Sequence, residues 1–61
     1  MTQAGDRVEL LSMSNDPNPI PSGMQGTVQH IDGGGTVHVT WDNGRNLGMI
    51  PGTDIWRVIY G

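Results

Sequence analysis

The chain has no cysteine and no lysine, and its three cationic side chains are Arg7, Arg45 and Arg57. Without cysteine it can form neither disulfides nor thiolate metal sites, and this composition fits a reducing compartment. Six acidic residues give a formal net charge of −3. Nucleic-acid binding draws on clustered Lys and Arg side chains that displace phosphate counterions. The composition therefore disfavours a nucleic-acid partner.

Long apolar runs are also missing. No run approaches the ~20 residues that are needed to span a bilayer. The segment Met1–Asp6 has neither the basic region nor the apolar stretch of a signal peptide. A length of 61 residues leaves room for one domain only. We therefore expect a single cytoplasmic domain over residues 1–61, with an ordered core over residues 5–60 and no membrane contact.

Ten glycines and four prolines interrupt the chain too often for long helices. Three of the prolines fall within residues 14–23, and proline lacks the amide donor that a central strand needs, so this segment is predicted to be a long loop. Pro51–Asp54 is predicted to be a tight turn. The remaining β-branched runs predict an all-β domain, with strands at 6–13, 26–31, 36–41 and 55–60 and one more around Leu47 and Met49.

The register of the first hairpin follows from the phase of its apolar side chains. A two-residue turn at positions 33–34 places Val28 opposite Val39 and His30 opposite Val37. Glycine supplies the positive φ angles of such a turn at little cost. We expect this hairpin to have the two-residue turn.

The second hairpin looks at first like an Asn-Gly two-residue turn, but side-chain phase favours a three-residue loop over Asp42–Gly44. This loop pairs Val39 with Leu47 and Val37 with Met49. Its third position requires a left-handed residue, and Gly44 occupies it.

Four segments stand out together: Gly5–Val8, Gly26–Val28, Val39–Arg45 and Ile50–Asp54. They resemble an uncharacterised family of short bacterial and phage proteins, a domain of unknown function with an SH3-like barrel. The resemblance runs from Gly5 to about Trp56. It implies a small five-stranded SH3-like barrel and carries no activity. The predicted strands, with a long loop after the first and a tight turn before the last, fit the same barrel.

Two looser resemblances share the segments Gly5–Val8 and Gly23–Val28. One is to the SH3-like accessory subunits of ferredoxin-dependent and nitrile-hydrating enzymes, and those subunits dock on a catalytic partner. The other is to the KOW motif of ribosomal and transcription proteins, but the basic residues expected there are absent. The first implies a partner protein and the second implies a nucleic acid.

No residue pattern predicts catalysis, a metal or a cofactor. His30 and His38 are the only histidines, and the favoured register points them to opposite sides of the sheet. Residues 15–18 offer oxygen ligands but lack the glycine and distal glutamate of an EF-hand loop. The glycines at 33–35 precede a strand, whereas a phosphate site needs a helix. We expect a protein that is not an enzyme.

The last run is apolar on both faces, with Ile55 and Ile59 on one face and Trp56, Val58 and Tyr60 on the other. The first run likewise carries Leu11 and Met13 out of phase with Val8 and Leu10. A half-exposed strand should alternate. The surplus side chains either form an interface with a partner or reach the core through a bulge.

Two turn-flanking residues have simpler interpretations. Trp41 continues the phase of Val37 and Val39, so we expect it in the core or at its edge. Arg45 lies just beyond Gly44, where it is either a solvated charge or the partner of Asp42 across the turn.

The sequence thus predicts a non-catalytic accessory module that docks on a partner protein through Ile20, Met24, Trp56 and Tyr60. One alternative is a structural protein that self-assembles by pairing its terminal strands. A further alternative is a KOW-like module that binds nucleic acid.

Overall fold

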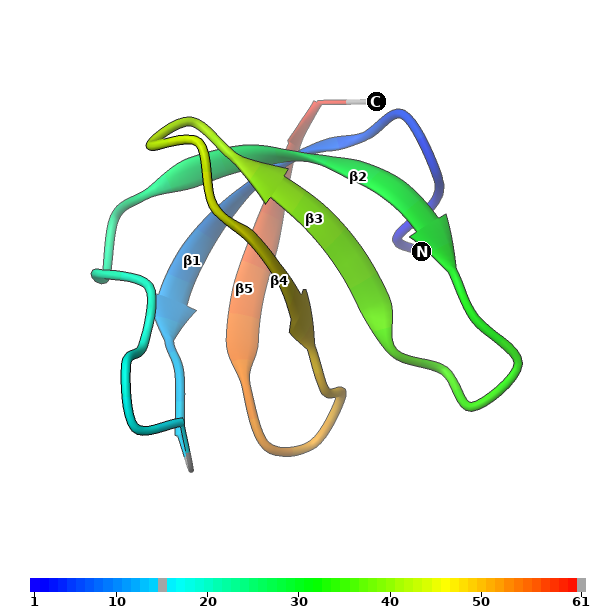
Figure 1. Ribbon diagram of the computed structural model, residues 1–61. Coiled ribbons are helices and arrows are strands. Elements are labelled where there is room, and N and C mark those ends of the chain that lie inside the picture. Colours follow the sequence, from blue (N-terminus) through cyan, green and yellow to red (C-terminus); the bar gives the residue numbers. More distant parts are fainter. Residues whose placement is uncertain (15, 61) are drawn as a thin grey trace.

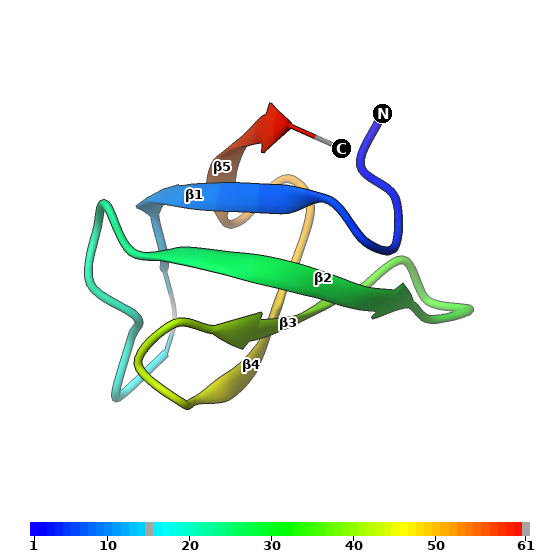
Figure 2. The same ribbon diagram turned by 90° about the horizontal axis from the view of Figure 1, so that it is seen from above.

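The computed structural model describes residues 1–14 and 16–60. Within them five antiparallel strands form one strongly curved sheet in the order β4-β3-β2-β1-β5 (Figures 1 and 2). The all-β class is confirmed. No hydrogen-bonded ladder joins the two edge strands β4 and β5 across the described residues. The strand bounds are β1 (Arg7–Ser12), β2 (Gln25–Ile31), β3 (Val37–Trp41), β4 (Asn46–Met49) and β5 (Ile55–Tyr60).

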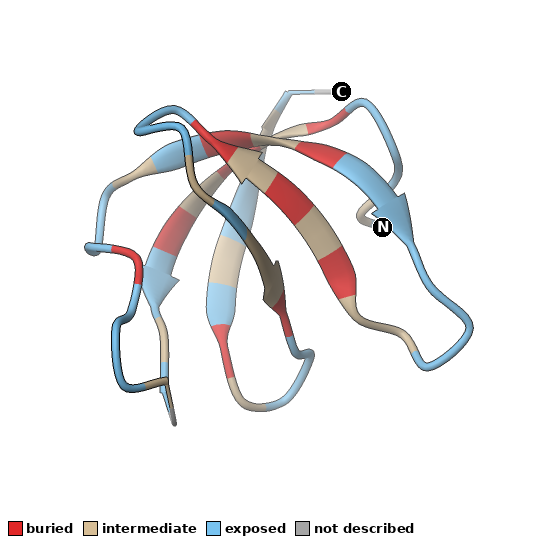
Figure 3. Cartoon of the chain, in the orientation of Figure 1, coloured by how far each residue is buried: buried red, intermediate tan, exposed pale blue. Residues whose placement is uncertain are grey.

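The core lies on the concave side of the sheet, where alternate residues of the strands meet. Burial alternates most regularly along β3, and β5 is mostly exposed (Figure 3). Trp41 is the largest fully buried side chain, as its phase predicts, and its Nε1 donates to the Leu47 carbonyl at 3.0 Å. The buried apolar cluster consists of Val8, Leu10, Ile20, Val28, Val37, Val39, Trp41 and Met49.

The β3–β4 hairpin has the predicted three-residue loop. Val39 pairs with Leu47 and Val37 with Met49. The Gly44 amide donates to the Trp41 carbonyl at 2.9 Å, and Gly44 has a φ of 88°. The prediction from side-chain phase is confirmed, because only this loop keeps the apolar residues of both strands on the core face.

The β2–β3 hairpin differs from its prediction. The Asp32 amide donates to the Thr36 carbonyl at 3.1 Å, and the positive φ of 88° belongs to Gly35. The loop therefore has three residues, and the two-residue turn at 33–34 was wrong. Val28 still pairs with Val39, because β2 carries a bulge between Val28 and His30 that offsets the longer loop.

The same bulge overturns the expected position of His30. His30 lies opposite His38, where Val37 was expected, and Ile31 lies opposite Val37. The two histidines therefore share one side of the sheet, and the prediction that they face opposite sides was wrong. One extra residue in β2 reverses the face of the residues that follow it.

Register shifts also occur where β1 pairs with β5, between Arg7 and Val8 and between Leu10 and Ser12. The second shift leaves Leu11 exposed and brings Met13 against the core. Of the two surplus apolar residues of the first strand, Met13 therefore reaches the core through a bulge, whereas Leu11 stays on the surface.

The turn before β5 is tight, as predicted, because the amides of Thr53 and Asp54 both donate to the Ile50 carbonyl, at 3.1 and 2.9 Å. The buried Asp54 carboxylate accepts hydrogen bonds from the amides of Ser14 at 3.0 Å and Ile50 at 2.9 Å. These bonds anchor the start of the proline-rich loop to the turn. Over residues 1–14 and 16–60 there is no helix of the length and apolarity that a membrane span requires.

Candidate interaction site

The structure places the four predicted docking residues in different environments. Ile20 is only 2% exposed and belongs to the core. Met24 and Trp56 are partly buried and pack against the core. Tyr60 is 63% exposed. The proline-rich loop therefore contributes Ile20 to the inside of the domain, and Tyr60 is the most exposed member of the set.

The largest group of exposed apolar side chains lies on the β1–β5 pair. Leu11 is 45% exposed, Ile55 58%, Val58 40% and Tyr60 63%. We call these four residues the β5 surface, although they do not all lie on one side of the sheet. Val58 lies opposite the buried Val8, whereas Tyr60 lies opposite Arg7 on the outer side. The sequence pointed to this region because β5 lacks polar–apolar alternation. It marked Leu11, Ile55 and Val58 as surplus apolar residues but did not include them among the docking residues, because their exposure depends on where the bulges fall.

The edge position of β5 contributes to the exposure of its three members. β1 covers one of its sides, and no other strand of the described sheet pairs with it. Across the ladder, Arg57 Nε donates to Glu9 Oε1 at 2.6 Å, so one face of β5 carries an ion pair among the apolar residues. Aromatic and aliphatic side chains beside an ion-paired arginine are typical of protein interfaces.

A depression of about 290 Å³ adjoins the β5 surface. Trp56 forms part of its wall, and the Trp56 Nε1 donates to the Thr2 hydroxyl at 3.1 Å. That bond fixes the ring orientation and ties the N-terminal segment to β5. The depression is lined by residues of the turn before β5 and of the start of that strand: Pro51, Gly52, Asp54, Ile55 and Trp56.

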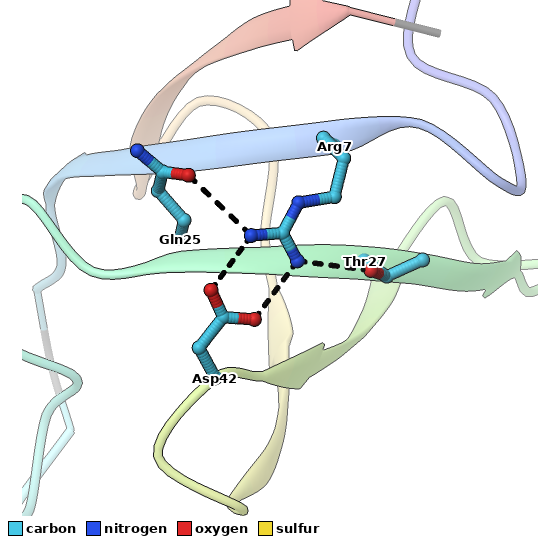
Figure 4. A network of polar contacts seen from close by, with 4 residues as sticks. All are labelled: Arg7, Gln25, Thr27 and Asp42. Atoms are coloured by element: carbon cyan, nitrogen blue, oxygen red, sulfur yellow. Dashed lines mark hydrogen bonds and ion pairs between the residues drawn. The ribbon is translucent and has the colours of Figure 1, made fainter.

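A second cluster joins β1, β2 and the turn after β3 (Figure 4). The Arg7 guanidinium donates to both Asp42 oxygens, at 2.8 and 2.6 Å, and also to Thr27 Oγ1 at 3.1 Å and Gln25 Oε1 at 3.4 Å. Asp42 thus pairs with Arg7, and of the two alternatives for Arg45 the pair with Asp42 is not among the ion pairs of the described residues. The sheet order brings Arg7 and Asp42 together although 35 positions separate them.

This pair also shifts the pKa values of its two members. The hydrogen bond from Arg7 holds the pKa of Asp42 below its ordinary value of 3.8. The hydrogen bond to Asp42 likewise raises the pKa of Arg7. With Arg57 bound to Glu9, two of the three cations in the chain are already matched by carboxylates.

On the outer side of β2 and β3, the imidazole rings of His30 and His38 stack with centroids 4.3 Å apart and planes 8° from parallel. His38 Nε2 lies 2.8 Å from Asp32 Oδ2, and the hydrogen bond from His38 is the main reason that the pKa of Asp32 is lowered. Among the described residues, no three His, Cys, Asp or Glu side chains converge as metal ligands.

The described part of the loop over residues 15–18, which offers oxygen ligands, makes a local hydrogen bond. Asp16 Oδ1 accepts from the Asn18 amide at 2.9 Å, a turn-stabilising contact that is common beside proline. Asn15, the first residue of that segment, lies outside the described residues.

The family described as Domain of unknown function (DUF4314) matches residues 2–59, nearly the whole chain. The chain belongs to this family. Neither the curated proteins nor the solved structures contain a match.

Proposed function

We propose that this member of the DUF4314 family is an SH3-like barrel that acts as a non-catalytic binding module and docks on a partner protein. Its proposed location is the cytoplasm of a bacterium or of a phage-infected host. The fold assignment is supported by the strand order β4-β3-β2-β1-β5, the strong curvature of the sheet, the long loop after β1 and the tight turn before β5 (Figure 1).

The observation that carries the binding role is the β5 surface. Seven large hydrophobic side chains are exposed among the described residues, and four of them lie on the two paired strands β1 and β5. Scattered single apolar residues are ordinary on a protein surface, but a concentration on one strand pair is typical of an interaction site. Tyr60 and Ile55 are the most exposed of the four, so we expect them to make the central contacts.

The core residues play an indirect part in this proposal. Ile20 is buried in the core and Met24 is partly buried against it, so we assign the partner contacts to the β5 surface. Trp56 lines the depression next to the turn before β5, together with Ile55.

Affinity capture from lysate of the native host, read by mass spectrometry, tests the proposal. The tagged protein should enrich a specific partner. The exchanges Ile55→Ser and Tyr60→Ser should each remove that partner, whereas Ile31→Ser should retain it. Ile31 is a suitable control because it is also exposed, at 42%, but lies at the far end of β2. Equal capture by all variants would contradict the role of the β5 surface.

Self-assembly is the second candidate, because β5 is a sheet edge that carries exposed apolar residues. An unprotected edge strand can pair with the same strand of another copy. Light scattering after size exclusion separates the two candidates: a purified oligomer that Tyr60→Ser dissociates would favour self-assembly, and a monomer would favour a foreign partner. Nucleic-acid binding is the weakest candidate, because Arg7 and Arg57 are both held in ion pairs.

A further inference from the structure

The two edge strands of the sheet differ in how well they are protected from pairing with another chain. Strand β4 has four residues, its last residue Met49 is fully buried, and Pro51 follows shortly after it. Strand β5 has six residues and none of them is fully buried. It contains no proline, and its pairing with β1 is regular from Trp56 to Val58. Short length, proline and bulges are common protections of an edge, and the middle of β5 lacks all three.

The side of β5 that faces away from β1 has room for another strand. Of the other four strands, only β1 has a Cα atom within 8 Å of a Cα atom of β5. Paired strands lie about 4.8 Å apart, so β4 leaves this side open along its whole length. In an antiparallel ladder, the amides and carbonyls of alternate residues point away from the neighbouring strand. On β5 these groups point to the open side, where the backbone of an added strand would pair with them.

The existing neighbour of β5 shows which side chains this strand accepts. β1 presents the segment Val8–Leu10 to the segment Trp56–Val58, and its order is apolar, acidic, apolar. Glu9 at the centre lies opposite Arg57. Arg57 uses its Nε for Glu9 Oε1, at 2.6 Å, and its side chain is 58% exposed. Its two terminal amino groups have no hydrogen-bond partner within residues 1–14 and 16–60, so they can accept a second carboxylate.

We infer that the open edge of β5 binds an extended segment of the partner protein, with an acidic residue opposite Arg57 and an apolar residue on each side of it. This inference rests on the proposed docking role of β5 and adds the kind of segment that docks. Main-chain hydrogen bonds would supply affinity, and side chains would supply specificity. The two apolar residues would lie beside Trp56 and Val58, and the depression of about 290 Å³ at the start of β5 offers room for a side chain.

A second copy of this chain is a poorer occupant of the edge. Its own apolar, acidic, apolar segment, Val8–Leu10, is already paired within its sheet. Strand β5 contains no acidic residue, so the β5 of another copy would give Arg57 no carboxylate. Pairing centred on Arg57 would place two like charges opposite each other, which destabilises a ladder. These points favour a segment from a different protein.

Amide hydrogen exchange of the 15N-labelled protein in the presence of a capped peptide tests the inference. The probe is Thr-Val-Glu-Leu-Thr, which repeats the order found in β1. We expect amides of alternate β5 residues to exchange fast in the protein alone and to become protected at millimolar peptide. The same peptide with N-methyl groups on its three central residues cannot donate from them and should give no protection.

Three results of this experiment would overturn the inference. The first is no protection of β5 at millimolar peptide. The second is protection of β4 in place of β5. The third is protection of β5 that rises with protein concentration in the absence of peptide, which would assign the edge to a second copy of the chain.

A lysine at the centre of the peptide tests the pairing with Arg57. Thr-Val-Lys-Leu-Thr should bind roughly three- to tenfold more weakly than the glutamate peptide, because like charges then oppose each other across the ladder. The net charge of −3 would favour the lysine peptide, so a preference for glutamate requires a local contact. Arg57→Gln should remove this preference, whereas the matched control Arg45→Gln should keep it. Equal affinity of the parent protein for both peptides would overturn the inference.

The peptide experiments and the capture experiment fail independently. If Ile55→Ser and Tyr60→Ser remove a captured partner but the glutamate peptide does not protect β5, the docking role stands and strand addition is wrong. If the glutamate peptide protects β5 but capture is the same for all variants, the edge accepts such a strand and the proposed docking surface is wrong.

Discussion

The two halves of the sheet use their apolar residues in different ways. In β3 and in the first part of β2, apolar side chains alternate with polar ones and are buried, whereas Ile31, beyond the bulge in β2, is 42% exposed. In β1 and β5, bulges interrupt the pairing, and four large apolar side chains remain exposed. Strand β3 has a neighbour on each side, whereas β5 has only β1. This difference contributes to the exposure of β5, but it does not decide burial alone: Met49 on the edge strand β4 is fully buried, whereas Leu11 on β1, which has two neighbours, is 45% exposed.

The two tryptophans give the largest expected contrast between the halves. Trp41 in β3 is 1% exposed, and Trp41→Ala should cost about 3–5 kcal/mol of unfolding free energy. Trp56 in β5 is only partly buried, so Trp56→Ala should cost clearly less, about 1–2 kcal/mol. Urea unfolding followed by circular dichroism measures both. Equal losses would show that β5 contributes to the core as much as β3.

Two glycine-to-alanine substitutions test how closely β2 packs on β3. A Cβ on Gly26 in β2 would lie 2.6 Å from Val39 Cγ1 and 2.9 Å from the Thr40 carbonyl oxygen. Gly26→Ala should therefore destabilise the domain by about 2–3 kcal/mol. Gly33→Ala is the matched control, because a Cβ there meets nothing within 4 Å, and its effect should stay within about 1 kcal/mol. Similar unfolding midpoints for both variants would contradict the close packing of β2 on β3.

The acid dependence of stability tests the ion pair that ties the halves together. Arg7 lowers the pKa of Asp42, so the pair stabilises the folded state above the ordinary carboxyl value of 3.8, and this stabilisation is lost as pH falls below it. Without Arg7, the unfolding free energy should depend less on pH in this range. We expect Arg7→Gln to reduce the slope of unfolding free energy against pH below about pH 4. Arg45→Gln removes the same charge without touching either ion pair and should leave the slope unchanged.

These contrasts also show which features the sequence could predict. The β3–β4 register was predictable because two apolar pairs and Gly44 all require the same three-residue loop. The β2–β3 loop was not, because three consecutive glycines do not indicate which one adopts the positive φ. The bulge before His30 gives no local signal either. The two errors cancel at Val28 and Val39, so a correct pair concealed an incorrect loop.

The candidate site was less predictable than the fold, for a physical reason. Ile20 follows three turn-forming positions in a proline-rich loop, and nothing nearby in sequence indicates that it enters the core. The Arg7–Asp42 pair joins residues 35 positions apart and depends on the order of strands. The loss of alternation in β5 was visible, but separating Tyr60 from Trp56 required the three-dimensional position of the bulges.

Substitutions in the β5 surface should have the smallest effect on stability. They test most directly the claim that this surface binds a partner. The measurement is the unfolding free energy and the partner capture of one double variant, Ile55→Ser with Tyr60→Ser. Exposed side chains that serve a partner should contribute little to folding, so we expect a loss below about 1 kcal/mol together with complete loss of capture. A loss of several kcal/mol, or full stability with capture retained, would contradict the claim that these residues are exposed for binding.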